Sequence, residues 1–364
     1  MKAGIVGLPN VGKSTLFNCL SNAKAQSANF PFCTIEPNIG VVNVPDPRIE
    51  KLEELVKPER VQMASVDIVD IAGLVKGASK GEGLGNQFLG NIRECNAIIH
   101  VLRCFDNENI IHVDGNVNPI RDKETIDIEL QLKDLETVEK RLEKVKRAAK
   151  TGNKEAQTEE GLLNRIRETL LQAKSARTVE PKNHEEAELM ESFQLITAKP
   201  VLYVCNVDED AAATGNKYVD QVRELVKDEN AEVIVLAVGT EADITELETY
   251  EERKMFLEDL GLEEPGASVL IRAAYKLLNL QTYFTAGVKE VRAWTIPIGA
   301  TAPQAAGVIH TDFEKGFIRA EVIAYNDFVS YGSEAKVKEA GKLRVEGKEY
   351  IVKDGDVMHF RFNV

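Results

Sequence analysis

The feature that most constrains the fold of this chain is the string Gly-Leu-Pro-Asn-Val-Gly-Lys-Ser-Thr at residues 7–15. An apolar run at residues 2–6 precedes it, and an apolar-periodic stretch at 16–20 follows it. The string matches G-x-x-x-x-G-K-[ST], a pattern in which glycines let backbone N–H groups surround anionic oxygens. Strand, glycine-rich loop and helix in this order predict a nucleoside triphosphate site at the carboxyl end of a buried strand.

Each polar position of this loop has an expected role. Lys13 supplies a positive charge to the outer phosphates and is therefore also a catalytic candidate, while the Ser14 hydroxyl is expected to ligate Mg²⁺. The loop positions expected to contact the nucleotide are Asn10, Val11, Gly12, Lys13, Ser14 and Thr15.

Composition narrows the class of protein. The 364 residues are sufficient for two or three domains, and no apolar stretch approaches the roughly 18 residues that span a bilayer. The first residues enter the strand directly, without a signal-peptide pattern, and the five cysteines form no C-x-x-C pair. We therefore expect a soluble cytoplasmic protein with reduced thiols, no zinc site and no membrane contact.

The charge balance is acidic, with a formal net charge of −14. Such a surface argues against indiscriminate nucleic-acid binding, and no DNA partner is expected. Residues 140–150 are a basic island, with six basic side chains against one acidic side chain. This island is either a solvated helix face or a contact for RNA or the ribosome.

Apolar runs at 2–6, 65–71, 97–105, 200–206 and 232–238 predict five strands, and helical patterns lie between several of them. This alternation predicts an α/β fold with a mostly parallel sheet. From residue 128 the sequence pattern changes to apolar residues at 3-4-3-4 spacing. The pattern breaks at 151–153, and a second apolar stripe follows at 162–170. Two antiparallel helices are expected here, either projecting from the sheet or covering one of its faces.

Beyond about residue 277 the chain becomes β-rich. Strand-like runs at 291–298, 316–324, 348–352 and 358–362 are separated by Gly and Pro. No nucleophile–base pair or metal-ligand cluster is evident in this part. A small β-rich module that serves as a binding surface is therefore expected.

Two further segments fit a Mg²⁺-nucleotide site. Thr34 lies where a switch segment would follow the loop helix, and its hydroxyl would ligate Mg²⁺ when a γ-phosphate is present. Asp70 ends an apolar strand and is followed by Gly73, which fits the second acidic element of P-loop NTPases. Asp70 is expected to hold Mg²⁺ through water, and the Gly73 N–H to sense the γ-phosphate.

With these strings the chain resembles the TRAFAC-class, Ras-like NTPases and, more closely, the Obg-like ATPase family known as YchF. The residues that carry this resemblance are the segments 7–14, 29–38, 70–79 and 278–285. The resemblance implies a discontinuous P-loop NTPase (OBG-type G) domain at 1–127 and 198–277, a helical coiled-coil insertion at 128–197, and a ubiquitin-like β-grasp (TGS) domain at 278–364. It also implies contact with the ribosome through rRNA or a ribosomal protein.

Base recognition is expected at Asn206, Val207 and Glu209. A guanine-specific relative would carry Asn-Lys-x-Asp here, whereas this chain has Asn-Val-Asp-Glu. Adenine presents an acceptor at N1 and a donor at N6, so a carboxylate aimed at the guanine edge would face a lone pair. The departure favours ATP over GTP, although Asp208, one position early, leaves a register shift open.

Hydrolysis is expected to be slow. Leu74 stands where Ras-like enzymes place the Gln that orients water. His112 is a candidate water-orienting group, or a loop histidine bonded to nearby backbone. Asn10 resembles the residue with which some relatives recruit K⁺ in place of an arginine finger.

Three functions remain open from the sequence. The first is a Mg²⁺-dependent ATPase switch that binds ATP and ADP and docks to ribosomes as a monomer. The second is a GTPase of the same fold. The third is a nucleotide-gated binding protein for which hydrolysis is incidental.

Overall fold

The computed structural model describes residues 1–22, 39–71, 84–107, 109, 110, 112 and 115–363. Contacts between residues divide the chain into two compact units. The first comprises Met1–Gly40 and Asp67–Leu270, and the second comprises Val41–Val66 and Ile271–Val364. Of the helices in the described ranges, none combines the length and apolarity that crossing a bilayer requires.

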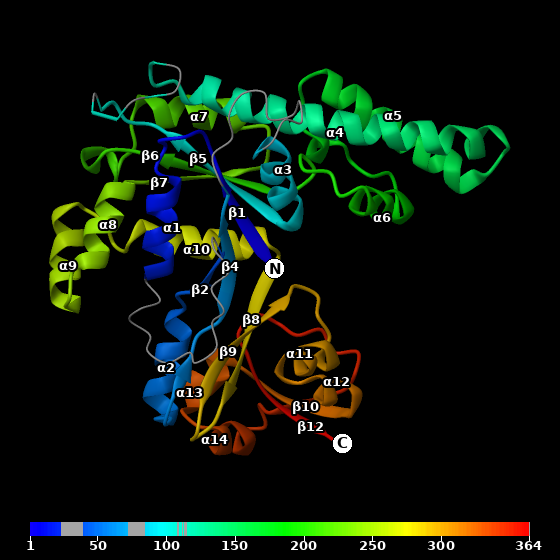
Figure 1. The fold of residues 1–364 in the computed structure, drawn as a ribbon. Coiled ribbons are helices and arrows are strands. Elements are labelled where there is room, and N and C mark those ends of the chain that lie inside the picture. Colours follow the sequence, from blue (N-terminus) through cyan, green and yellow to red (C-terminus); the bar gives the residue numbers. More distant parts are fainter. Residues whose placement is uncertain (23–38, 72–83, 108, 111, 113–114, 364) are drawn as a thin grey trace. The chain divides into compact units, whose positions relative to one another are not determined.

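Most of the first six-stranded sheet, with the order β2-β4-β1-β5-β6-β7, belongs to the first unit (Figure 1). Its strands are β1 (Lys2–Val6), β2 (Ile39–Asn43), β4 (Ser65–Asp70), β5 (Ala97–Arg103), β6 (Val201–Asn206) and β7 (Glu232–Leu236). β1 pairs in parallel with β4 on one side and β5 on the other, and β5–β6 and β6–β7 are parallel too. The five predicted strands are confirmed with small shifts of their ends, and β2 was not predicted.

Helices follow most of these strands: α1 (Lys13–Asn22), α3 (Leu84–Glu94), α7 (Lys217–Val226), α8 (Val238–Glu246), α9 (Tyr250–Asp259) and α10 (Gly266–Leu277). In α7 the Asn216 side chain accepts from the N–H groups of Tyr218 and Val219, which begins the helix. Val219 and Val222 then bury one face against the unit.

A separate helical core lies in the same unit. α4 (Pro119–Lys150) and α5 (Lys154–Leu171) run antiparallel, as the ion pairs Arg141–Glu159 and Arg167–Glu139 show (Figure 1). Their apolar stripes pack with η2 (Ala176–Thr178) and α6 (His184–Ser192). The cluster consists of Val138, Leu142, Leu162, Leu163, Ile166, Leu170, Ala176, Val179, Phe193 and Leu195, none of which belongs to a strand.

The helix expected from residue 128 begins earlier. α4 starts at Pro119, and the Asn118 side chain accepts from the Arg121 N–H at 3.1 Å. Asn at the N-cap and Pro in the first turn form a helix start that the apolar spacing alone does not reveal. Farther along, Asp134 accepts from Ile196 N (2.9 Å) and Thr197 N (2.7 Å), which ties α4 to the segment before β6.

The second unit has its own six-stranded sheet, of order β11-β10-β12-β8-β9-β3. The strands are β3 (Val61–Gln62), β8 (Leu280–Ala286), β9 (Val291–Pro297), β10 (Phe317–Ala324), β11 (Arg344–Glu346) and β12 (Asp356–Phe362). The predicted strand at 348–352 is wrong: Ala302 N bonds to Tyr350 O and Val352 N to Ala300 O, with only an isolated bridge at Ile351. The segment therefore bonds to the residues before α11 and not to a strand, and a turn closed by Tyr350 N and Gly347 O precedes it.

Helices cover both faces of this sheet. On one face, α11 (Ala302–Ile309) and α12 (Thr311–Lys315) pack on a core that includes Tyr283, Met358 and Phe360. On the other face lie α2 (Pro47–Val56) and α13 (Tyr325–Tyr331), followed by α14 (Glu334–Glu339). The small side chains of α11, mainly alanines, let the helix lie close to the large aromatic residues of the sheet.

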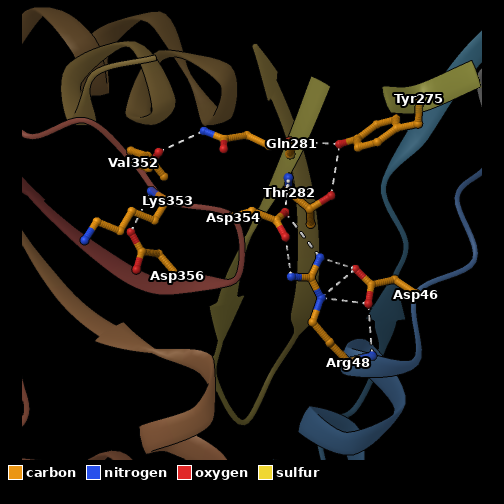
Figure 2. Close-up of polar contacts among 9 residues, drawn as sticks. All are labelled: Asp46, Arg48, Tyr275, Gln281, Thr282, Val352, Lys353, Asp354 and Asp356. Carbon is orange, nitrogen blue, oxygen red and sulfur yellow. Dashed lines mark hydrogen bonds and ion pairs between the residues drawn. The ribbon is translucent and has the colours of Figure 1, made fainter. Parts of the chain in front are cut away.

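Arg48 of α2 ties three segments of the second unit together (Figure 2). Its guanidinium donates to both carboxylate oxygens of Asp46 and, at 2.7 Å, to Asp354 Oδ2. Asp354 also accepts from Thr282 N at 3.0 Å. Because Gly355 has a φ of 85° and a Cβ there would lie 2.9 Å from the Arg48 guanidinium, this turn requires glycine.

Candidate functional site

The loop between β1 and α1 has the backbone conformation of a phosphate cradle. β1 ends at Val6, α1 begins at Lys13, and between them Asn10 (φ 62°) and Gly12 (φ 99°) adopt left-handed conformations. Asn tolerates this region better than most side chains, and glycine does so without steric cost. The alternation turns successive N–H groups toward one concave side, which suits anionic oxygens.

Close packing around the loop explains both of its required glycines. A Cβ at Gly7 would lie 2.6 Å from Val101 O, and one at Gly12 would lie 2.6 Å from Asn206 Nδ2. The backbone of β5 and the Asn206 side chain of the neighbouring β6 therefore lie directly against the loop. The cradle is held rigid by the sheet that supports it.

The ammonium group of Lys13 is positioned to contact an anion in a buried site. Its side chain is nearly buried, and Nζ donates to Leu8 O at 2.6 Å. Burial lowers the pKa of Lys13 to about 8, and Asp70 opposes this shift. A phosphate anion would favour the charged form in the same way as Asp70, so the buried ammonium is suited to bind polyphosphate.

Two predicted metal ligands are brought together. Ser14 Oγ donates to Asp70 Oδ2 at 3.1 Å, across 56 residues of sequence. The other carboxylate oxygen, Asp70 Oδ1, is buried and has no hydrogen-bond partner among the described residues. A hydroxyl beside a carboxylate with an unused oxygen fits a hard cation such as Mg²⁺. Thr34 and Gly73, the other predicted contacts, lie outside the described residues.

Asn206 connects the loop to the start of α8. Its Nδ2 donates to Val11 O at 2.9 Å, and its Oδ1 accepts from Val238 N at 3.0 Å. Sequence reasoning assigned Asn206 to the base and missed this bridging contact, because Val238 had no motif that would single it out. Val207 is buried, with its N–H bonded to Leu236 O, whereas Glu209 is exposed at the start of a 3₁₀ turn.

His112 is a buried side chain whose partner is a carboxylate. Its Nε2 lies 2.8 Å from Asp122 Oδ2, and Arg121 contacts both the ring and the same carboxyl group. Both members of the His112–Asp122 pair are almost fully buried. The contact joins the loop after β5 to the first turns of α4, a partnership that the sequence did not indicate.

Two family models match the chain. Residues 2–134 match a model described as a 50S ribosome-binding GTPase. Residues 280–363 match the YchF-GTPase_C model, described as a protein of unknown function.

Curated relatives match along their full length. The chain is 59% identical to "Ribosome-binding ATPase YchF" of Escherichia coli O157:H7 and 58% identical to that of Pasteurella multocida, each over 100% of this chain and 99% of the relative. The Bacillus subtilis protein of the same name is 56% identical, with 100% of both chains covered. A solved structure titled as the Schizosaccharomyces pombe YchF GTPase superposes with a TM-score of 0.90 at 40% identity, covering 99% of this chain and 97% of that one.

Proposed function

Because this chain belongs to the YchF family, we propose that it is a Mg²⁺-dependent ATPase that binds the ribosome and uses its nucleotide state as a switch. The observation that carries the proposal is the Lys13–Ser14–Asp70 cradle on a chain that matches curated ribosome-binding ATPases from end to end. Its substrate is ATP, its product ADP, and its place of action the cytoplasm.

The nucleotide is bound by the loop from Asn10 to Thr15, with Lys13 facing the outer phosphates. Ser14 and Thr34 contribute hydroxyl ligands to Mg²⁺, and Asp70 holds the ion through water. Bound Mg²⁺ would add its positive charge to that of Lys13 in neutralising the phosphates. The Gly73 N–H senses the γ-phosphate.

Hydrolysis is slow in this proposal. Leu74 cannot orient water, and His112 must leave Asp122 to reach a γ-phosphate. Separating a buried histidine from its carboxylate costs free energy. Moving His112 from Asp122 to the γ-phosphate therefore requires a partner or a conformational change. K⁺ held near Asn10 is a second means of completing the site.

The base is adenine. Val207 and Glu209 replace the Lys and Asp of a guanine site, and Asn206 is committed to the loop and Val238. The alternative is a GTPase of the same fold, which the descriptions of the matched family model and of the S. pombe structure favour. Comparing ADP with GDP decides between them.

The chain acts as a monomer with three functional parts: the G domain at 1–127 and 198–277, the helical insertion at 128–197, and the TGS domain at 278–364. Support comes from the separate helical core of α4–α6 and from the β-rich second unit. The ribosome contacts are the TGS domain and the basic stretch of α4, where Lys144, Lys146, Arg147 and Lys150 are exposed.

Cosedimentation with ribosomes tests the switch. The wild-type chain and a Lys13→Ala variant are each mixed with ribosomes in a non-hydrolysable ATP analogue or in ADP, with Lys217→Ala as an exposed control. Wild type and control should bind differently in the two nucleotides, and Lys13→Ala should bind equally in both. Nucleotide-independent binding by the wild type would reject the switch and leave a binding protein for which hydrolysis is incidental.

A further inference from the structure

A fully buried arginine stands at the end of β5, where the loop that leads to His112 begins. Arg103 is the last residue of the strand, and its exposed fraction is only 1%. In the parallel pairing of β5 with β6 it lies opposite Asn206, whose side chain bonds to Val11 O of the phosphate loop. Neighbouring strands at this end of the sheet therefore support the phosphate loop and the start of the His112 loop.

The Arg103 guanidinium holds three backbone carbonyls of the His112 loop. Its Nε donates to Phe105 O at 3.2 Å, its Nη2 to Asn107 O at 3.1 Å and its Nη1 to Ile110 O at 2.9 Å. The guanidinium carbon also lies 4.7 Å from the centre of the Phe105 ring, in a cation–π contact. Because the donors of an arginine form a rigid planar fork, binding three carbonyls at once fixes how those carbonyls are arranged.

Residues 105–107, 109 and 110 form this carbonyl turn, which is also closed by bonds of its own. Ile110 N donates to Asn107 O at 3.3 Å, and Asn109 N donates to Asn107 Oδ1 at 2.9 Å. On the exposed side, the hydroxyl of Tyr218 on α7 donates to the Asp106 carboxylate at 2.9 Å. The turn is thus held from its buried side by the guanidinium and from its exposed side by α7.

Fixing the carbonyl turn limits where His112 can move. His112 follows Ile110 by two residues, so its Cα lies at most about 7 Å from the Cα of Ile110. In the structure the His112 ring is paired with Asp122 of α4. A ring that leaves Asp122 for the γ-phosphate therefore moves about a point whose position Arg103 determines. A fixed attachment point reduces the number of orientations that the ring samples, which raises the population of the reactive one.

We propose that Arg103 is a positioning residue for ATP hydrolysis, because it holds the carbonyl turn from which His112 reaches the γ-phosphate. Arg103 acts through His112 and contacts no reacting atom. This role rests on the proposed function, in which His112 orients the attacking water.

Exchanging the guanidinium for an ammonium tests this role. Arg103→Lys keeps the charge, but a single nitrogen cannot donate to three carbonyls in the same fork geometry. In single-turnover assays of the full-length protein, we expect ATP hydrolysis to slow at least fivefold. Calorimetric titration with ADP and Mg²⁺ should give a Kd within twofold of the wild-type value, because the contacts of the phosphate loop are unchanged.

The matched control is Arg253→Lys. Arg253 lies on α9 of the same unit, where its Nε and Nη2 both donate to Leu247 O. This arginine also binds a backbone carbonyl, but it lies outside the His112 loop. Its exchange for lysine should leave both the hydrolysis rate and the Kd for ADP unchanged.

An exposed variant loosens the same turn with the buried arginine in place. Asn107→Ala removes the Oδ1 that accepts from Asn109 N, and Asn107 is exposed, so the core is unaffected. Hydrolysis should slow at least twofold. Hydrogen exchange in the segment 105–112 should become faster in Arg103→Lys and Asn107→Ala but not in Arg253→Lys. If circular dichroism showed Arg103→Lys to be unfolded, Asn107→Ala would decide.

Combining variants shows whether Arg103 acts through His112. His112→Gln should slow hydrolysis by itself, and adding Arg103→Lys to it should slow hydrolysis no further. Three results would overturn the positioning role and leave that of His112 intact: a wild-type rate in Arg103→Lys, losses that multiply in the double variant, or a loss of ADP affinity as large as the loss of rate. A wild-type rate in His112→Gln would instead reject the role of His112 in the proposed function, and that of Arg103 with it.

Discussion

At the scale of single residues, the phosphate loop depends on positions where a side chain has no room. Gly12 combines a φ of 99° with a neighbour, Asn206 Nδ2, only 2.6 Å from where its Cβ would be. We expect Gly12→Ala to weaken ATP binding more than tenfold, because either Asn206 or the loop must move. Calorimetric titration measures this directly.

The matched control is Gly161→Ala on α5. A Cβ there meets nothing within 4 Å, and its φ is not in the left-handed region. This variant should bind ATP as the wild type does and be slightly more stable, since alanine is the better helix former. Equal loss of binding in both variants would contradict the close-packing explanation.

His100 makes the first unit sensitive to acid. It is fully buried in β5, and burial lowers its pKa to about 3, with Lys123 and Arg177 acting in the same direction. Its unfolded-state pKa is higher, so the unfolded chain binds the extra proton and stability falls as the pH drops below about 6.5. At pH 5 this group alone should cost about 2 kcal/mol of unfolding free energy.

The measurement is urea denaturation at pH 7 and pH 5, followed by far-ultraviolet circular dichroism. A His100→Gln variant removes the titrating group, so the difference between the two pH values should shrink by that amount. His184→Gln, at an exposed position, should keep the wild-type difference. The same pH dependence in all three chains would assign the acid sensitivity to other groups.

At the scale of elements, strands buried on both faces were predictable and irregular ones were not. β1, β5 and β6 are continuous apolar runs, and that signal located them. β2 lies in a sheet but is only half-buried, and β11 has three residues, so neither carries a clear pattern. The segment 348–352 has strand-like residues, yet its backbone bonds to a loop, a tertiary contact that local preference cannot reveal.

The Arg48 cluster is expected to stabilise the second unit. Arg48→Ala removes the donors to Asp46, which is largely buried, and to Asp354, which is half exposed. We expect a loss of about 2 kcal/mol in the free energy of unfolding, below the usual cost of breaking a buried pair because water screens Asp354. Urea denaturation followed by Trp294 fluorescence reports on this unit.

The control variant lies one turn along the same helix. Lys51→Ala removes an exposed pair with Glu54 and should leave the unfolding midpoint unchanged. If Arg48→Ala also left it unchanged, the cluster would contribute nothing to stability.

The basic face of α4 is expected to contribute electrostatically to ribosome binding. Reversing three exposed charges, Lys144, Lys146 and Arg147 to Glu, should weaken binding and flatten its salt dependence by roughly one power of salt for each phosphate that is no longer neutralised. The control reverses the exposed Lys217 and Arg223 of α7 and Lys227 directly after it, in the same unit, with the same change in net charge. Cosedimentation with ribosomes over a salt series compares the two triple variants. Equal losses of ribosome binding would assign the weakening to net charge alone.

At the scale of the whole molecule, the sequence predicted the elements of the nucleotide site but not the side-chain contacts that link them. The loop and Asp70 follow from motif and strand pattern, and the structure brings Ser14 within hydrogen-bond distance of Asp70. The bridge from Asn206 to Val238 and the pairing of His112 with Asp122 depend on which strands and helices become neighbours. Such contacts join residues without a motif, so their positions emerge only from the folded chain.

The central claim is that this fold holds ATP in its phosphate cradle and rejects guanine at the base. Isothermal titration of the purified full-length protein with ADP and with GDP, both with Mg²⁺, tests it most directly. We expect ADP to bind at least tenfold more tightly than GDP, with both signals lost in Gly12→Ala. Tighter binding of GDP than of ADP would contradict the account.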